Sequence, residues 1–112
     1  MARAACRLQP DDGYILNTLG VAQYRCGLVG DAVSNLTRSN ELNHGQQPAD
    51  LAFLALARYR LGQSDNARGT LARLREVMRT PAWASDRESG MMLHEAETIE
   101  LEELFSTVPF AP

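Results

Sequence analysis

The sequence predicts an all-α protein, a short right-handed solenoid of helix-turn-helix pairs with a C-terminal capping helix. Residues 13–46 resemble residues 47–80 when shifted by 35 positions, which aligns Tyr24 with Tyr59. Apolar residues in each half recur at the three- and four-residue spacing of an amphipathic helix. A period near 35 residues with two helices per unit is typical of helical-repeat arrays.

The 112 residues are expected to form a single domain. Its predicted parts are residues 2–12 (second helix of a truncated repeat), 13–46 and 47–80 (two complete repeats), 84–105 (an acidic capping helix) and 106–112 (a tail). Because the first helix of the first unit is missing, we expect a fragment of a longer protein. A natural start at Met1 is the alternative.

The first elements are bounded by proline, aspartate and glycine. Residues 2–9 are expected to form a short helix that ends at Pro10, which cannot continue one. Asp12 is expected to cap the helix over residues 13–26. Gly27 can end that helix in a left-handed conformation.

The next helices show similar signals. Gly20 lacks a side chain and should allow the helix over residues 30–43 to cross closely. Pro48 suits the first turn of the third helix, Asp50 suits its positive end, and Gly62 should end it. A fourth helix then runs to Thr80-Pro81.

The last helix is expected to begin with a capping box, Ser85-x-x-Glu88, and to reach about Phe105. Its predicted apolar stripe consists of Met92, Leu93, Ala96, Ile99, Leu101 and Leu104. Glutamates occupy most of the remaining positions. Such a helix would keep the open end of a repeat array in contact with water.

The repeated residues carry a family resemblance. They are Leu16, Leu19, Gly20, Ala32 and Leu36 in the first unit and Leu51, Leu54, Ala55, Ala67 and Leu71 in the second. This pattern resembles the tetratricopeptide repeat (TPR) family. Tyr24 and Tyr59 sit one place later than the usual aromatic residue, and His44 stands where the family has proline. The resemblance implies a binding scaffold whose partner is set by surface residues.

A narrower resemblance concerns residues 17–25 and 51–57, which are similar to the TPR tails of bacterial, planctomycete-like multidomain serine/threonine kinases. It implies a module that recruits or orients a partner for catalytic domains elsewhere in a larger protein.

Several functional classes are not expected. All eleven basic residues are arginine, which excludes lysine chemistry such as a Schiff base. His94 begins a sequence like a helical zinc motif, but Thr98 stands where the second histidine is required. We therefore expect no enzyme activity, no cofactor and no metal site. Cys6 and Cys26 are expected to be buried reduced thiols.

Charge and hydropathy argue against a nucleic-acid-binding protein and against a membrane-spanning one. Residues 1–80 contain ten arginines and seven acidic residues, whereas residues 81–112 contain one arginine and seven acidic residues. The net charge of the chain is -3. We expect no nucleic-acid binding, since that needs a net basic domain. No apolar run is long enough to span a membrane, and a cytoplasmic location is expected.

The predicted function is protein–protein interaction through the concave face formed by the first helix of each pair. The candidate groove residues are Tyr14, Asn17, Val21, Tyr24, Arg25, Phe53, Leu56, Tyr59 and Arg60. Aromatic residues and arginine often anchor interfaces. The alternative for Phe53, Leu56 and the tyrosines is internal packing.

A different alternative is a structural spacer or homodimer without a peptide ligand. It would pair through the truncated N-terminal edge, at Ala2, Ala5, Cys6 and Leu8.

Overall fold

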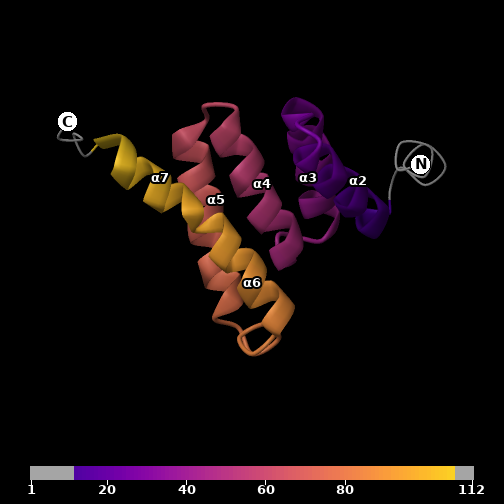
Figure 1. The fold of residues 1–112 in the computed structure, drawn as a ribbon. Helices are drawn as coiled ribbons and strands as arrows, with labels where there is room; N and C mark the ends of the chain where they lie inside the picture. Colours follow the sequence, from indigo (N-terminus) through magenta and orange to yellow (C-terminus); the bar gives the residue numbers. More distant parts are fainter. Residues whose placement is uncertain (1–11, 108–112) are drawn as a thin grey trace.

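The computed structural model describes residues 12–107, and this part of the chain is entirely helical, without strands (Figure 1). Its helices are α2 (Gly13–Arg25), α3 (Val29–Leu42), α4 (Pro48–Arg60), α5 (Ser64–Met78), α6 (Arg87–Ala96) and α7 (Thr98–Thr107). The all-α class is therefore confirmed for the described part. The predicted helix over residues 2–9, the N-terminal edge and residues 108–112 of the predicted tail lie outside the described residues. The predicted tail over 106–112 begins too early, because α7 continues to Thr107.

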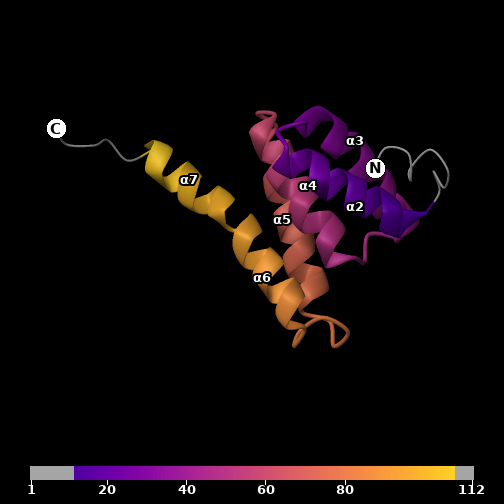
Figure 2. The ribbon, with the colours of Figure 1, turned by 45° about the vertical axis from the view of Figure 1, so that its right-hand side comes forward.

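Helices α2 and α3 form one hairpin, and α4 and α5 form a second (Figures 1 and 2). The turns of the two hairpins have the same backbone geometry. Gly27 has φ 84° and Gly62 has φ 82°, the left-handed conformation that glycine adopts without strain. The N–H following each glycine donates to the carbonyl five residues earlier, at 2.8 Å in the first turn and 3.0 Å in the second. Both glycines thus end their helices as predicted.

The predicted starts of α2 and α4 are also confirmed. Asp12 accepts a hydrogen bond from the backbone N–H of Ile15 at 3.2 Å and so caps α2. Pro48 occupies the first turn of α4. Its missing N–H costs nothing there, since the first turn has no intrahelical acceptor.

Helix α4 lies at the centre of the fold, and all side chains from Leu51 to Ala57 are buried. It packs against α3 and α5, and α6 covers a further side of it. The close crossing between α2 and α3 depends on Gly20, because a Cβ atom there would lie 2.6 Å from Cγ of Leu36. Leu36 itself is fully buried.

The start of the last helical segment differs from the prediction. The capping box at Ser85 and Glu88 does not form, and Asp86 is the N-cap of α6. Its Oδ2 accepts hydrogen bonds from the backbone N–H of Ser89 at 2.9 Å and from the Ser89 hydroxyl at 2.6 Å. Two donors from one buried serine make Asp86 the better cap.

The single helix predicted over residues 84–105 is also wrong, because a break at Glu97 separates α6 from α7. The hydroxyl of Thr98 donates to the carbonyl of Glu95 at 2.7 Å, a local bond of the kind that competes with helical hydrogen bonding. Helix α7 then projects away from the hairpins (Figure 2).

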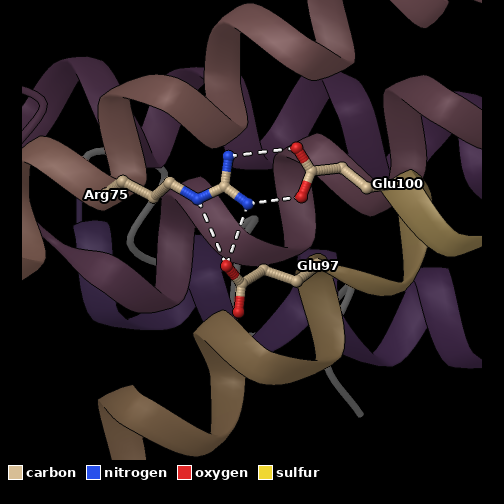
Figure 3. A network of polar contacts seen from close by, with 3 residues as sticks. All are labelled: Arg75, Glu97 and Glu100. Carbon is tan, nitrogen blue, oxygen red and sulfur yellow. Dashed lines mark hydrogen bonds and ion pairs between the residues drawn. The ribbon is translucent and has the colours of Figure 1, made fainter.

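One arginine of α5 holds both sides of this break (Figure 3). Arg75 donates to Glu97, the last residue before α7, at 2.9 and 3.2 Å. It also donates to Glu100 in the first turn of α7, at 2.6 and 3.2 Å. These contacts raise the pKa of Arg75 and, through the hydrogen bond with Arg75, lower the pKa of Glu100.

The predicted apolar stripe is buried only in part. Ala96 and Ile99 are buried, whereas Leu101 and Leu104 are more than half exposed because α7 leaves the body of the fold. Cys26 is a free thiol but is exposed, contrary to the prediction of a buried one, since it follows α2 in the turn.

Candidate functional site

A groove runs between α2, α4 and α6 and consists of two adjoining cavities of about 400 and 450 Å³. Asn17 of α2, Ala49 of α4, and Glu88 and Met92 of α6 line both cavities. Because these shared residues join the two spaces, we treat them as one feature, the α2–α4–α6 groove. Its volume is in the range of small-molecule and peptide side-chain sites.

The first cavity of this groove carries negative charge and aromatic surface. Tyr14 and Trp83 line it together with Asp86 and Glu88. The hydrogen bonds from Ser89 hold the pKa of the Asp86 carboxyl below its usual range, so that group is ionised at neutral pH. No arginine or histidine lines this cavity among the described residues, and we call it the acidic end of the groove.

Trp83 is held in place by a hydrogen-bonded turn between α5 and α6. Its N–H donates to the carbonyl of Thr80 at 3.1 Å, and its carbonyl accepts from the N–H of Asp86 at 3.0 Å. The indole ring is half-buried and packs against the core. This turn fixes both the aromatic ring and the neighbouring carboxylate.

The second cavity is more apolar. Val21, Ala22, Phe53 and Met92 line it, with Arg25 at its edge. We call it the apolar end of the groove.

Arg25 is placed by contacts on two helices. Its guanidinium carbon lies 5.1 Å from the ring centroid of Phe53, and its Nη2 donates to Glu95 at 3.5 Å. Both charged side chains are well exposed, so the pair is screened by water and contributes little to stability.

Beneath the groove lies a buried carboxylate. Asp50 is fully buried and accepts hydrogen bonds from Asn17 at 2.8 Å, from Ser39 at 2.7 Å and from Asn43 at 2.8 Å. Asn17 lies in α2, Ser39 lies in α3 and Asn43 follows the end of α3. The carboxylate of Asp50, which belongs to α4, therefore links three helices.

The predicted groove residues fall into three groups. Tyr14, Asn17, Val21, Arg25 and Phe53 line the α2–α4–α6 groove, and the structure thus brings them together. They are not equally accessible: Tyr14 is 81% exposed and Phe53 only 5%.

Tyr24 and Leu56 are buried in the core, which corresponds to the internal packing considered as the alternative. The Tyr24 ring meets the Phe53 ring edge-on, with centroids 5.8 Å apart. Burial raises the pKa of the Tyr24 hydroxyl.

Arg60 and Tyr59 belong to neither cavity. Arg60 is exposed, and its guanidinium carbon lies over the Tyr24 ring, 4.9 Å from the ring centroid. Tyr59 is partly buried near the same end of α4.

The sequence does not predict the groove residues that α6 and the turn before it contribute, among them Trp83, Asp86, Glu88 and Met92. Glu88 was assigned to a capping box and Met92 to the buried stripe. One signal was present, since the only tryptophan of the chain stands just before the acidic helix start.

Residues 12–107 contain no group of three or more histidine, cysteine, aspartate or glutamate side chains arranged to hold a metal ion. His44 and His94 are both exposed. In the same region no helix has the length and apolar character needed to cross a bilayer.

Comparison with known proteins gives no relative. No protein-family model matches the sequence, and no curated protein or solved structure shows a significant match.

Proposed function

We propose that this chain is a TPR-like protein-interaction module that binds a peptide or a short helix in the α2–α4–α6 groove. The observation that carries the proposal is the continuity of the groove, whose two cavities share residues from three helices. An extended segment needs a continuous surface with an apolar floor and polar edges. The groove is lined by buried Phe53 and partly buried Met92 and by the exposed charged side chains of Arg25 and Glu88.

The repeated hairpins support the TPR-like interpretation. Gly27 and Gly62 are 35 residues apart and share one backbone conformation. Gly20 and Ala55, also 35 apart, are both buried small residues in the first helix of their hairpins. In helical-repeat proteins such equivalent positions stack successive units, and the first helices line a common face.

A selection from a phage-displayed library of random dodecapeptides, using the purified chain as bait, tests the proposal. Peptides that are enriched are then synthesised and their affinities measured. The blocking variant is Ala22→Tyr, because Ala22 is exposed and lines the apolar end of the groove. Ala72→Tyr is the matched control, since Ala72 is exposed on α5 and lines neither cavity.

We expect Ala22→Tyr to weaken peptide binding by about tenfold or more, which is the effect of blocking a central interface contact. Ala72→Tyr should bind as the wild type does. The proposal is overturned if no peptide is enriched, or if the enriched peptides bind the Ala22→Tyr variant with unchanged affinity.

A further inference from the structure

The acidic end of the groove is rich in hydrogen-bond acceptors. Asp86 and Glu88 supply two carboxylates, and neither forms an ion pair with any arginine of the described residues. Oδ2 of Asp86 is used by Ser89, which leaves Oδ1 available to a ligand. Two unpaired carboxylates at a cavity favour a cationic group.

Buried Asp50 orients the side-chain amides of Asn17 and Asn43. A carboxylate only accepts hydrogen bonds, so the side chains of Asn17 and Asn43 must both direct their NH₂ groups towards it. Both asparagines also line the acidic end of the groove. One N–H of each amide is thereby committed to Asp50, and the amide carbonyl oxygens of both asparagines stay available as acceptors for a ligand.

Aromatic surface completes this cavity. Trp83 and Tyr14 line it, and Tyr14 is largely exposed. An indole ring is the strongest cation–π partner among the side chains. A flat cation with several N–H donors would use both the rings and the acceptors, and the guanidinium of arginine has five donors in one plane.

We propose that the acidic end of the groove, between Tyr14, Trp83 and Glu88, is the subsite for an arginine side chain of a bound peptide. This inference rests on the proposed function and specifies the chemistry of its partner. The apolar end begins at the shared residues Ala49 and Met92. The ligand is therefore a peptide in which an arginine lies a few residues from an apolar side chain, which occupies the space beside Val21 and Phe53.

The test compares peptides that differ in one side chain. Decapeptides with acetylated and amidated ends, derived from the enriched library sequences, carry arginine, citrulline or glutamate at a scanned position. Citrulline keeps the shape of arginine and lacks its charge. Binding is measured by titration and by the emission of Trp83, the only tryptophan in the chain.

The variant protein is Asp86→Asn/Glu88→Gln, which removes both charges and keeps the shapes of the side chains. Asparagine is as good an N-cap as aspartate, so α6 should retain its start. Asp31→Asn/Glu41→Gln is the matched control, because it removes two exposed charges from α3, away from the groove.

We expect arginine peptides to bind the wild type about tenfold more tightly than citrulline peptides, and the Asp86→Asn/Glu88→Gln variant to lose this preference. The control variant should keep it. Arginine binding should also shift the Trp83 emission. Equal affinity for arginine and citrulline peptides, with Ala22→Tyr still blocking both, overturns the arginine subsite and leaves the peptide groove standing.

A preference for arginine that survives in the Asp86→Asn/Glu88→Gln variant also overturns the subsite, since recognition would then occur elsewhere. If no peptide of either kind binds, the proposed function itself falls.

Discussion

The carboxylate of Asp50 on α4 accepts a hydrogen bond from the side-chain amide of Asn17 on α2, at 2.8 Å. Ser39 and Asn43 donate to the same carboxylate, which has no exposed surface. A buried charge without a basic partner is costly unless hydrogen bonds replace its water shell. In this fold three donors do so, and the cost of removing the acceptor is correspondingly high.

We predict that Asp50→Asn destabilises the chain by about 2–4 kcal/mol, because an asparagine amide directs donors at side chains that are themselves donors. Urea unfolding followed by circular dichroism at 222 nm measures the free energy of unfolding. Asp31→Asn is the control, since Asp31 is exposed on α3 and its change should stay within about 0.5 kcal/mol. Equal effects of the two variants would show that the Asp50 network contributes nothing.

The same network shows what the sequence could and could not predict. Helix ends at Asp12, Gly27, Pro48 and Gly62 depend on local backbone preferences, so neighbouring residues suffice to predict them. Asp50 was interpreted as an ordinary acidic residue of a first helical turn. Its burial depends on donors from other helices, which come together only when the hairpins pack.

The groove was predictable to a similar extent. Helical periodicity indicated that Asn17, Val21 and Phe53 share a face with other residues of their helices, and they do line the groove. Periodicity could not predict that α6 would lie across α4 and add Glu88 and Met92. That placement follows from the path of the turn and from packing of the apolar face of α6.

The crossing at Gly20 gives a second prediction. Gly20→Ala should destabilise the chain by about 1–2 kcal/mol, because the added methyl group would collide with buried Leu36. This net value already includes the better helix propensity of alanine, about 1 kcal/mol.

Gly69→Ala is the matched control, since Gly69 lies inside α5 and no atom would meet its Cβ within 4 Å. It should stabilise the chain by about 0.5–1 kcal/mol through helix propensity alone. Thermal unfolding of both variants gives the comparison, and stabilisation by Gly20→Ala would refute the close crossing.

Two tyrosines of α2 should separate packing from binding. Tyr24 is 8% exposed and Tyr14 is 81% exposed. Tyr24→Ala should reduce the free energy of unfolding by about 3 kcal/mol, since it leaves a cavity beside Phe53. Tyr14→Ala should change it by less than about 0.5 kcal/mol.

Tyr14→Ala, which should hardly change stability, is expected to weaken peptide binding. Tyr14→Ala should weaken the affinity for an arginine peptide by about threefold at unchanged helicity, because it removes one aromatic ring from the acidic end. Unchanged affinity would remove Tyr14 from the groove, and a large loss of stability in this variant would contradict its exposure.

The contact between Arg75 and Glu100 leads to a pH-dependent prediction for α7. The hydrogen bond from Arg75 lowers the pKa of Glu100 below its ordinary value of 4.5. A carboxyl whose pKa is lowered by folding contributes stability above its unfolded pKa, and that contribution disappears as the pH falls through the lower, folded pKa. The side-chain contact between Glu100 of α7 and Arg75 of α5 should therefore weaken below about pH 4.5, starting from full strength at pH 7.

Amide hydrogen exchange over residues 98–107, measured by mass spectrometry at pH 7 and pH 3 and corrected for intrinsic rates, tests this. At pH 7, Arg75→Gln should speed exchange in α7 by about two- to fivefold, the range expected for partly exposed ion pairs. At pH 3 the variant and the wild type should differ less than at pH 7, because protonation of Glu100 weakens its contact with Arg75. Arg79→Gln serves as the control, since Arg79 is exposed at the end of α5 and should leave α7 unchanged at both pH values. A difference between Arg75→Gln and wild type that persists undiminished at pH 3 would contradict the role of the Glu100 charge. No difference at pH 7 would mean that α7 is held by packing at Ile99 rather than by this charge network.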